Sequence, residues 1–406
     1  MIDQLAAYLD VPGREPLLVG DAFFTIKAAR LVSTTFRYDT GYLGQRLAFP
    51  IDPDLTLSTG TQHVNGLPGA LEDSAPDRWG RNLTTKLQRH ATLVAGRRAA
   101  SLSDADFLVG VSDFTRQGAL RFRADGEGPF LGTSNEVPRL LELPRLLNAA
   151  DAVSRDDDFT AIKELLEAGS GSLGGARPKA SVRDGDRLLI AKFPHPDDDW
   201  DVMAWEKTAL DLAKKAGIRV PEVRLAHTDG RAVLLLERFD RISDGRVPYM
   251  SAMTLLSAHD GDSHDYLEIS EALPAVGSAA RKDLNELWRR IVFSVFVNNT
   301  DDHLRNHGFL DERGGWALSP VFDVNPNPDT DTPRQTTIGG ASRREDALAG
   351  AHSYAGDFDL DDQAATRVLS EVRAAVFGWR DIAAANSVPE KQMEMFGDAF
   401  WTPKKP

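Results

Sequence analysis

The chain has 406 residues, a length that predicts two or three domains rather than one core. Its 42% hydrophobic and 27% charged residues are typical of a soluble globular protein. The net charge of −14 argues against non-specific nucleic-acid binding, and the lack of cysteine excludes disulfides, thiolate metal sites and a cysteine nucleophile.

The first residues, MIDQLAAYLDVPGREPLL, lack the basic region and the uninterrupted apolar run of a secretory signal. The longest strongly apolar runs, such as IVFSVFV at 291–297, are far shorter than the roughly 20 residues that span a bilayer. We therefore expect a cytoplasmic protein without a membrane partner.

Short β-like runs separated by Gly, Pro and Asp turns fill residues 1–125, which we expect to form an N-terminal subdomain. Within it, GALEDSAPDRWGRNLTTKLQRH predicts a loop and then a helix, with Pro76 in the first helical turn. Residues 124–137 are rich in turn residues and predict a connector, and 138–167 predicts helix.

A glycine-rich stretch, GSGSLGGARPKA at 169–180, follows this helical region. Its first six residues fit G-x-G-x-x-G, but a dinucleotide-binding loop needs a strand before it and a helix after it. Here helical sequence precedes the glycines and a predicted hairpin follows them. A glycine-rich loop that leads into a strand with a lysine is the order found in kinases, where backbone N–H groups approach phosphate oxygens. For the glycines alone, a plain linker is the alternative.

Two β-like runs around Asp184-Gly185-Asp186 predict a hairpin, and LLIAKF places Lys192 on its second strand. Such a lysine either extends to solvent from an edge strand or supplies a point charge to ATP phosphates. Apolar spacing predicts a helix over 201–216, and Glu206 on it is the candidate partner of Lys192. An ordinary solvent-facing glutamate is the alternative. AVLLLERFD then predicts a buried strand.

The strongest signal is NNTDDHLRN at 298–306, which follows a helix predicted by apolar spacing from Leu284 to Val295. Asp301 and Asn306 have the separation found in a kinase catalytic loop, where a carboxylate accepts the proton of the attacking hydroxyl and an amide oxygen binds Mg²⁺. SPVFDVN supplies Asp323, a second oxygen ligand, at the end of a predicted strand. A polar turn with a helix cap is the alternative for 298–306 alone.

His303 beside two aspartates also raises the alternative of a metal hydrolase, but no H-E-x-x-H or H-x-H pair supports it. Farther along the chain, 326–350 is rich in Pro, Thr, Asp and Gly and is expected to be a loop. Residues 361–385 predict a helix.

In this order, SLGGARPKA, LIAKFP, LLLERFDR, NNTDDHLRNHGFL and LSPVFDVNPNP resemble the HipA-type serine/threonine kinases of bacterial toxin–antitoxin modules. TTFRYDTGYL and GALEDSAPDRWGR resemble that family's N-terminal portion, and TTIGG with the closing helical region resembles its C-terminal portion. The resemblance implies an α+β, bilobal protein-kinase-like fold with a β-rich N-terminal lobe and a mostly α-helical C-terminal lobe. The expected divisions are 1–125 for the N-terminal subdomain, 138–240 for the rest of the N-terminal lobe and 241–406 for the C-terminal lobe.

The resemblance also implies roles for individual residues. Asp301 would be the catalytic base, Asn306 and Asp323 would bind Mg²⁺, and the backbone at Glu237 and Phe239 would contact adenine. Ser172 matches a position that family members can autophosphorylate. With Glu237 and Phe239, the implied ATP-binding residues are Gly174, Gly175, Ala176, Lys179, Lys192 and His303. The chain differs from eukaryotic kinases in lacking H-R-D and D-F-G.

The expected function is an ATP- and Mg²⁺-dependent protein serine/threonine kinase that acts as a growth-arresting toxin. The resemblance implies targets in translation, with aminoacyl-tRNA synthetases as the leading class, and a small DNA-binding antitoxin that makes most of the DNA contact. Two alternatives stay open: a small-molecule phosphotransferase such as an antibiotic kinase, and a non-catalytic pseudokinase that acts by complex formation.

Overall fold

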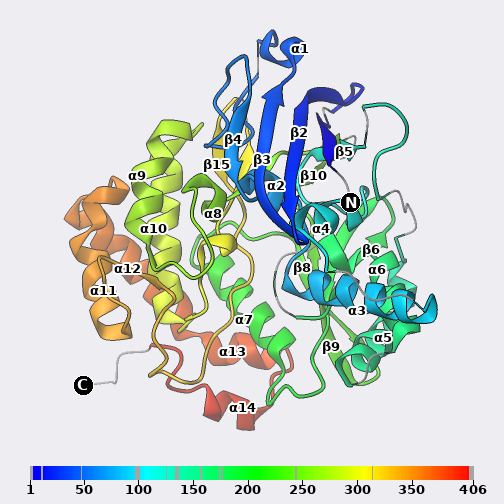
Figure 1. The fold of residues 1–406 in the computed structure, drawn as a ribbon. Coiled ribbons are helices and arrows are strands. Elements are labelled where there is room, and N and C mark those ends of the chain that lie inside the picture. The colour runs from blue at the N-terminus through cyan, green and yellow to red at the C-terminus, as the bar shows by residue number, and fades with distance from the viewer. Residues whose placement is uncertain are drawn as a thin grey trace, which may run out of the picture. The chain divides into compact units, whose positions relative to one another are not determined.

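The structure is a computed structural model that describes residues 3–10, 12–46, 48–96, 101–124, 126–132, 137–155, 158–172, 175, 177–242, 245–312 and 314–401. The chain forms two compact units (Figure 1). Unit 1 comprises Met1–Asp197 and His227–Met250, and unit 2 comprises Asp198–Ala226 and Ser251–Pro406. The predicted divisions at 1–125, 138–240 and 241–406 stay predictions.

Unit 1 contains an antiparallel sheet with the strand order β4-β3-β2-β1-β5. Buried and less buried residues alternate along much of β2 and β3, the pattern of a sheet with one face on a core. Val19, Phe36 and Phe122 belong to that core. The strands are β1 (Gln4–Leu9), β2 (Leu17–Lys27), β3 (Arg30–Tyr38), β4 (Gln62–Asn65) and β5 (Leu120–Arg123).

The helices of unit 1 follow the turn-rich segments between these strands. Asp77 caps α3, because its side chain accepts a hydrogen bond from the backbone N–H of Gly80. Pro76 therefore lies before the helix, and its predicted place in the first turn is wrong. The helices are α1 (Thr40–Leu43), α2 (Gly69–Glu72), α3 (Arg78–Val94), α4 (Asp104–Gly110), η1 (Leu140–Glu142), α5 (Leu143–Arg155), α6 (Phe159–Glu167) and η2 (Ser170–Ser172). The helical sequence predicted at 138–167 is thus confirmed.

A second sheet has the strand order β6-β7-β9-β8. Strands β6 and β7 form the predicted hairpin, which turns at Gly185 with a φ of 60°, a left-handed conformation that glycine adopts easily. The buried strand predicted from AVLLLERFD is β9. The strands are β6 (Lys179–Asp184), β7 (Arg187–Lys192), β8 (Val223–Thr228) and β9 (Arg231–Glu237), followed by the short pair β10 (Arg241–Ile242) and β11 (Gly245–Arg246).

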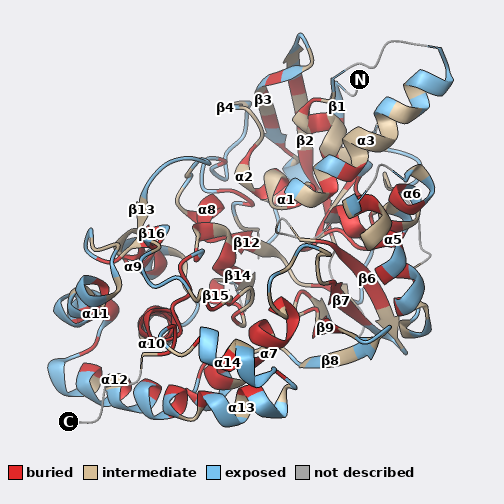
Figure 2. Ribbon diagram, turned by 90° about the horizontal axis from the view of Figure 1, so that it is seen from below, coloured by how far each residue is buried: buried red, intermediate tan, exposed pale blue. Residues whose placement is uncertain are grey.

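Helix α10 (Ala280–Phe296) is the central helix of unit 2, and Figure 2 shows that most of it is buried. It packs against α9, α11 and α12, because apolar residues such as Leu287, Ile291 and Val295 follow helical spacing. The other helices are α7 (Val202–Lys215), α8 (Ala252–Leu255), α9 (Tyr266–Val276), η3 (Leu304–Asn306), α11 (Arg344–Ser353), η4 (Ala355–Phe358), α12 (Asp362–Phe377), α13 (Trp379–Ala385) and α14 (Glu390–Met395). The remaining strands are β12 (Tyr249–Ser251), β13 (His264–Asp265), β14 (Gly308–Asp311), β15 (Trp316–Leu318) and β16 (Thr336–Thr337).

Three expectations for the C-terminal half are corrected. Segment 326–350 is not all loop, because α11 begins at Arg344 and buries Ala347 and Ala351. Residues 361–385 form two helices, α12 and α13, with Gly378 between them. Asp323 does not end a strand, since β15 stops at Leu318, shortly before a proline that cannot donate a ladder hydrogen bond.

The β-rich unit 1 and the mostly helical unit 2 confirm the expected α+β, two-lobed fold class. None of the helices in the described ranges combines the length and apolar character that a membrane span requires.

Candidate functional site

Hydrogen bonds of two asparagines, Asn298 and Asn327, hold the loop after α10. Asn298 has a φ of 53°, a left-handed conformation that asparagine tolerates better than most residues. Its Nδ2 donates to the carbonyl oxygen of Asn327 at 2.7 Å, and the backbone N–H of Asn327 donates back to the carbonyl of Asn298 at 3.0 Å. The side chain of Asn327 also donates to Thr300 Oγ1 at 3.0 Å. Segment 298–300 is therefore held against Asn327.

Asp301 and Asn306, the predicted base and metal ligand, lie in one closed turn. Nδ2 of Asn306 donates to the backbone oxygen of Asp301 at 3.2 Å, which leaves Oδ1 of this buried amide as an acceptor. Asp301 is exposed, and its Oδ1 accepts a hydrogen bond from Gln335 Nε2 at 2.7 Å. The Asp301 carboxylate is thus exposed to solvent, while Gln335 restrains one of its two oxygens.

The pKa of the Asp301 carboxyl is raised above its usual value. Partial desolvation is the largest cause; the His303 side chain opposes it, while the charges of Asp323 and Asp302 raise the pKa further. Asp323 therefore belongs to the electrostatic surroundings of Asp301. A carboxylate with a raised pKa is a better proton acceptor near neutral pH.

Asp323 lies in a left-handed backbone conformation with a φ of 57°, which is uncommon for a non-glycine residue. Nδ2 of Asn325 donates to Asp323 Oδ1 at 3.2 Å, and the backbone N–H of Asn325 donates to Asn299 Oδ1 at 3.3 Å. Oδ1 of Asn325 is buried, and no donor within the described residues is bonded to it.

These oxygens fit a hard cation. The carboxylate of Asp323 and the amide oxygens of Asn306 and Asn325 are the ligand types that Mg²⁺ takes, and a buried amide oxygen without a donor favours a nearby positive charge. The predicted assignment of Mg²⁺ to Asn306 and Asp323 is thus chemically consistent with their surroundings.

Asp302, the residue after Asp301, belongs to a buried polar network. Asp302 accepts a hydrogen bond from Tyr266 Oη, and His307 Nε2 lies 3.1 Å from Asp302 Oδ1. Arg334 donates to Tyr266 Oη at 3.4 Å and to Ser294 Oγ. Burial alone would raise the pKa of Asp302, but His307, Tyr266 and Arg334 outweigh it and lower the pKa to about 2. The second aspartate of the motif is therefore a buried anion that holds the loop in place.

Lys192 lies on β7, which pairs with β6 on one side and β9 on the other. Its exposed fraction is 8%, so the alternative of a solvent-reaching lysine on an edge strand is wrong. Glu206 on α7 is only 1% exposed, and the alternative of a solvent-facing glutamate is also wrong. The pairing of the two stays a prediction, because they belong to different units.

The start of the glycine-rich segment packs on helix α3 within unit 1. Lys179 begins β6, and its Nζ lies 2.8 Å from Asp77 Oδ2. A Cβ on Gly80 of α3 would come 2.7 Å from the Cα of Gly171. Gly175 has a φ of 110°, which favours glycine. Gly174 and Ala176 lie outside the described residues, as does the side chain of Ser172, and their predicted roles stay predictions.

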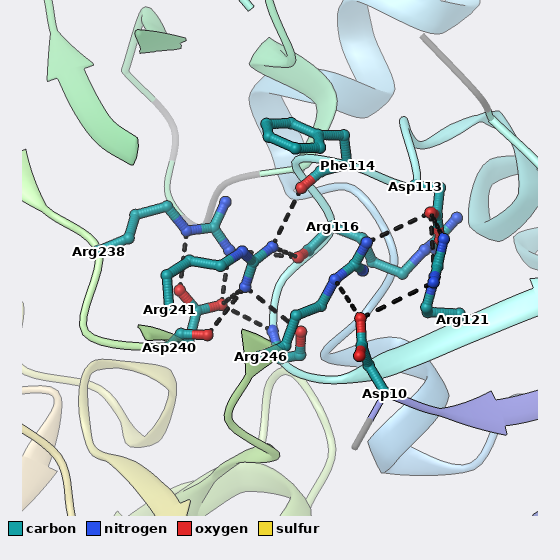
Figure 3. Close-up of polar contacts among 10 residues, drawn as sticks. Asp10, Asp113, Phe114, Arg116, Arg121, Arg238, Asp240, Arg241 and Arg246 are labelled. Carbon is teal, nitrogen blue, oxygen red and sulfur yellow. Dashed lines mark hydrogen bonds and ion pairs between the residues drawn. The ribbon is translucent and has the colours of Figure 1, made fainter. Parts of the chain in front are cut away.

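The predicted adenine-contacting residues, Glu237 and Phe239, alternate with the buried charged residues Arg238 and Asp240. Figure 3 shows Arg238 and Arg241 beside Asp240. Asp240 accepts hydrogen bonds from Arg238 Nη2 at 2.6 Å, from Arg241 Nη1 at 2.8 Å and from the backbone N–H of Gly118 at 2.8 Å. Burial raises the pKa of Asp240, but the two guanidinium groups dominate and lower it well below its usual value.

The same arginines bind the segment 114–118. Arg238 Nη2 and Arg241 Nη2 both donate to the backbone oxygen of Arg116, and Arg238 Nη1 donates to that of Thr115. Desolvation lowers the pKa of Arg241 to about 9. The N-terminal part of unit 1 therefore fixes the backbone on which Glu237 and Phe239 lie.

Sequence reasoning missed several residues around Asp301, Lys179 and Asp240. ERFDR holds four charged residues at the end of an apolar strand, a signal that could have pointed to a buried ion network. Gln335, Tyr266 and Asp77 carry no such signal, because a single polar residue in a loop or at a helix end is common.

Comparison with known proteins agrees with the resemblance. Residues 171–379, just over half of the chain, match the family model of the HipA-like C-terminal domain. Over 283 residues the chain is 26% identical to Toxin YjjJ of Escherichia coli (strain K12), covering 65% of this chain and 61% of that protein. Over 136 residues it is 31% identical to "Putative kinase Y4dM" of Sinorhizobium fredii (strain NBRC 101917 / NGR234), covering 29% and 32%. These alignments span less than two thirds of each relative.

Among solved structures, HipA from the complex of Shewanella oneidensis MR-1 HipA, HipB and operator DNA matches with a TM-score of 0.66. The match covers 97% of this chain and 94% of that chain at 15% identity, so it shows a shared fold. With the family match over 171–379, it confirms the resemblance inferred from the motifs. The chain belongs to the family of proteins with a HipA-like C-terminal domain.

Proposed function

We propose that this protein is a HipA-like kinase that transfers the γ-phosphoryl group of ATP to a serine or threonine hydroxyl of another protein. The observation that carries the proposal is the environment of Asp301, an exposed carboxylate with a raised pKa. Gln335 donates a hydrogen bond to one of its oxygens, and the side chain of Asn306 donates to its backbone. These are the properties that a general base needs in phosphoryl transfer.

In the proposed step, the substrate hydroxyl oxygen forms a bond to the γ-phosphorus, and the bond from that phosphorus to the β,γ-bridging oxygen of ADP breaks. The hydroxyl proton passes to Asp301 Oδ2, because Oδ1 is occupied by Gln335. Lys192 would place a positive charge on the ATP phosphates. Asn306 and Asp323 would hold Mg²⁺, which supplies charge neutralisation to the phosphates when bound.

Our proposals for substrates and partners rest on the relatives and on the net charge of the chain. Similarity to Toxin YjjJ supports a growth-arresting toxin, and the HipA complex with HipB and operator DNA supports a small DNA-binding antitoxin partner. The net charge of −14 favours DNA contact through that partner. We propose proteins of translation, with aminoacyl-tRNA synthetases first, as targets, and Ser172 as an autophosphorylation site whose added negative charge would repel ATP.

Quantitative phosphoproteomics of cells that express the protein or its Asp301→Asn variant tests this function. We expect new serine and threonine phosphosites only with the unchanged protein, including sites on aminoacyl-tRNA synthetases. Consumption of ATP without new protein phosphosites would favour a small-molecule phosphotransferase. Failure to bind Mg-ATP in isothermal titration calorimetry would favour a pseudokinase.

A further inference from the structure

The segment Gln335–Thr336 binds three successive residues of the loop that carries Asp301. The backbone N–H of Gln335 donates to the carbonyl of Thr300 at 3.0 Å, and Gln335 Nε2 donates to Asp301 Oδ1 at 2.7 Å. Thr336 Oγ1 donates to the carbonyl of Asp302 at 2.6 Å. The two stretches, more than thirty residues apart in sequence, therefore lie in register within unit 2.

The residues on either side of Gln335 are anchored. The backbone N–H of Arg334 donates to the carbonyl of Ser342 at 2.9 Å, and the buried Arg334 side chain also donates to Ser294 Oγ. Thr337 Oγ1 donates to Asp265 Oδ2 at 2.6 Å, and β16 pairs in parallel with β13. The backbone of Gln335 is thus held from both sides before its side chain reaches Asp301.

Alternation along this extended segment decides which side chain reaches the carboxylate. Arg334 and Thr336 are buried, whereas Gln335 between them is exposed. The amide of Gln335 therefore contacts Asp301 at the surface, since both residues are exposed. Its position depends on the buried neighbours rather than on packing of its own side chain.

The contact with Gln335 makes the two oxygens of the Asp301 carboxylate different from each other. The terminal torsion of an aspartate is broad, so a lone carboxylate rotates over a wide range. Gln335 holds Oδ1, and within the described residues no donor is bonded to Oδ2. Fixing one oxygen orients the other, and near-attack geometry in an active site is sensitive to such orientation.

We propose that Gln335 is a positioning residue for phosphoryl transfer: its Nε2 holds Asp301 Oδ1 so that Oδ2 faces the acceptor hydroxyl. The inference rests on the proposed function and adds a residue that acts through Asp301 rather than on ATP. It predicts an effect on kcat, because the carboxylate acts on the hydroxyl proton during transfer. The KM for ATP should not change.

The test compares Gln335→Leu, which removes the donor, with Gln335→Asn, which keeps an uncharged amide donor on a shorter side chain. Gln45→Leu is a matched control, because Gln45 is also exposed and its side chain also makes one hydrogen bond, to the backbone of Gly41. Initial rates are measured with Mg-ATP and a protein acceptor found by phosphoproteomics, and thermal unfolding is followed for each variant.

We expect Gln335→Leu to lower kcat about tenfold with an unchanged KM for ATP and an unchanged Tm. Gln335→Asn should recover part of kcat, and Gln45→Leu should match the unchanged protein. If the unchanged protein is active and Gln335→Leu has the same kcat, the positioning role is overturned but the proposed function is not. A fall in Tm large enough to explain the lost rate would also overturn the positioning role. No transfer by the unchanged protein would overturn the proposed function, and the role of Gln335 with it.

Discussion

Lys179 of β6 and Asp77 at the start of α3 form an ion pair of 2.8 Å whose side chains are 2% and 7% exposed. Asp77 Oδ1 also caps α3 through the backbone N–H of Gly80. One aspartate thus joins helix α3 to strand β6. Lys179, predicted from the resemblance as an ATP-binding residue, also has a structural partner within unit 1.

Removing one member of this pair should destabilise the protein strongly, because it takes the opposite charge away from a buried ionised side chain. We expect Lys179→Met to lower the free energy of unfolding by about 3 kcal/mol, measured by urea unfolding. The double variant Lys179→Met, Asp77→Asn should recover part of the loss, since asparagine still caps the helix.

The pair between Arg37 and Asp21 is the control, because the Arg37 side chain is half exposed. Arg37→Ala should change the free energy of unfolding by less than about 1 kcal/mol. If Lys179→Met and Arg37→Ala lower the free energy of unfolding equally, the buried pair stabilises the protein no more than the exposed pair.

Gly80 predicts a second stability effect. Replacing a helix glycine by alanine normally stabilises a helix by about 1 kcal/mol. At Gly80 the new Cβ would come 2.7 Å from Gly171 Cα and 3.0 Å from Gly171 O, so backbone must move. We expect Gly80→Ala to lower the urea midpoint. Gly110→Ala in α4 should keep or raise it, because among the described residues no atom outside the adjacent residues and the backbone of its own helix lies within 4 Å of the new Cβ. A gain at Gly80 would contradict the close approach of α3 and the glycine-rich segment.

Asp240 predicts an acid-sensitive contribution to stability. A carboxyl whose pKa is lower in the folded chain than the unfolded value of about 3.9 contributes stability above that value, which is lost as pH falls toward the folded pKa. We expect the unchanged protein to lose more unfolding free energy between about pH 5 and pH 3 than the Asp240→Asn variant. Parallel pH profiles for the two proteins would show that Asp240 is not held as an anion by Arg238 and Arg241.

The sequence predicted what is local. The spacing of Asp301 and Asn306 predicted one loop, and the Asn306 side chain donates to the Asp301 backbone within it. The hairpin at Gly185 and the helix of Leu287 and Ile291 follow from turn chemistry and helical spacing in the same way.

Contacts between distant segments could not be predicted from one sequence. Gln335 lies 34 positions from Asp301, and Gly118 lies 122 positions from Asp240. Helix α11 was expected to be loop because its surroundings are rich in turn residues. Burial of Ala347 and Ala351, with the indole of Trp288 on α10 donating to the Ala351 carbonyl at 2.8 Å, favours the helix instead.

The most direct test of the central claim is phosphate transfer from radiolabelled Mg-ATP by the purified protein and by Asp301→Asn, with their unfolding temperatures compared. The substitution keeps size and shape and removes the proton acceptor. Our account predicts labelled phosphoserine or phosphothreonine with the unchanged protein and a loss of at least about a hundredfold with Asp301→Asn at an unchanged unfolding temperature. Equal transfer by the two proteins would contradict the role of Asp301 as the base.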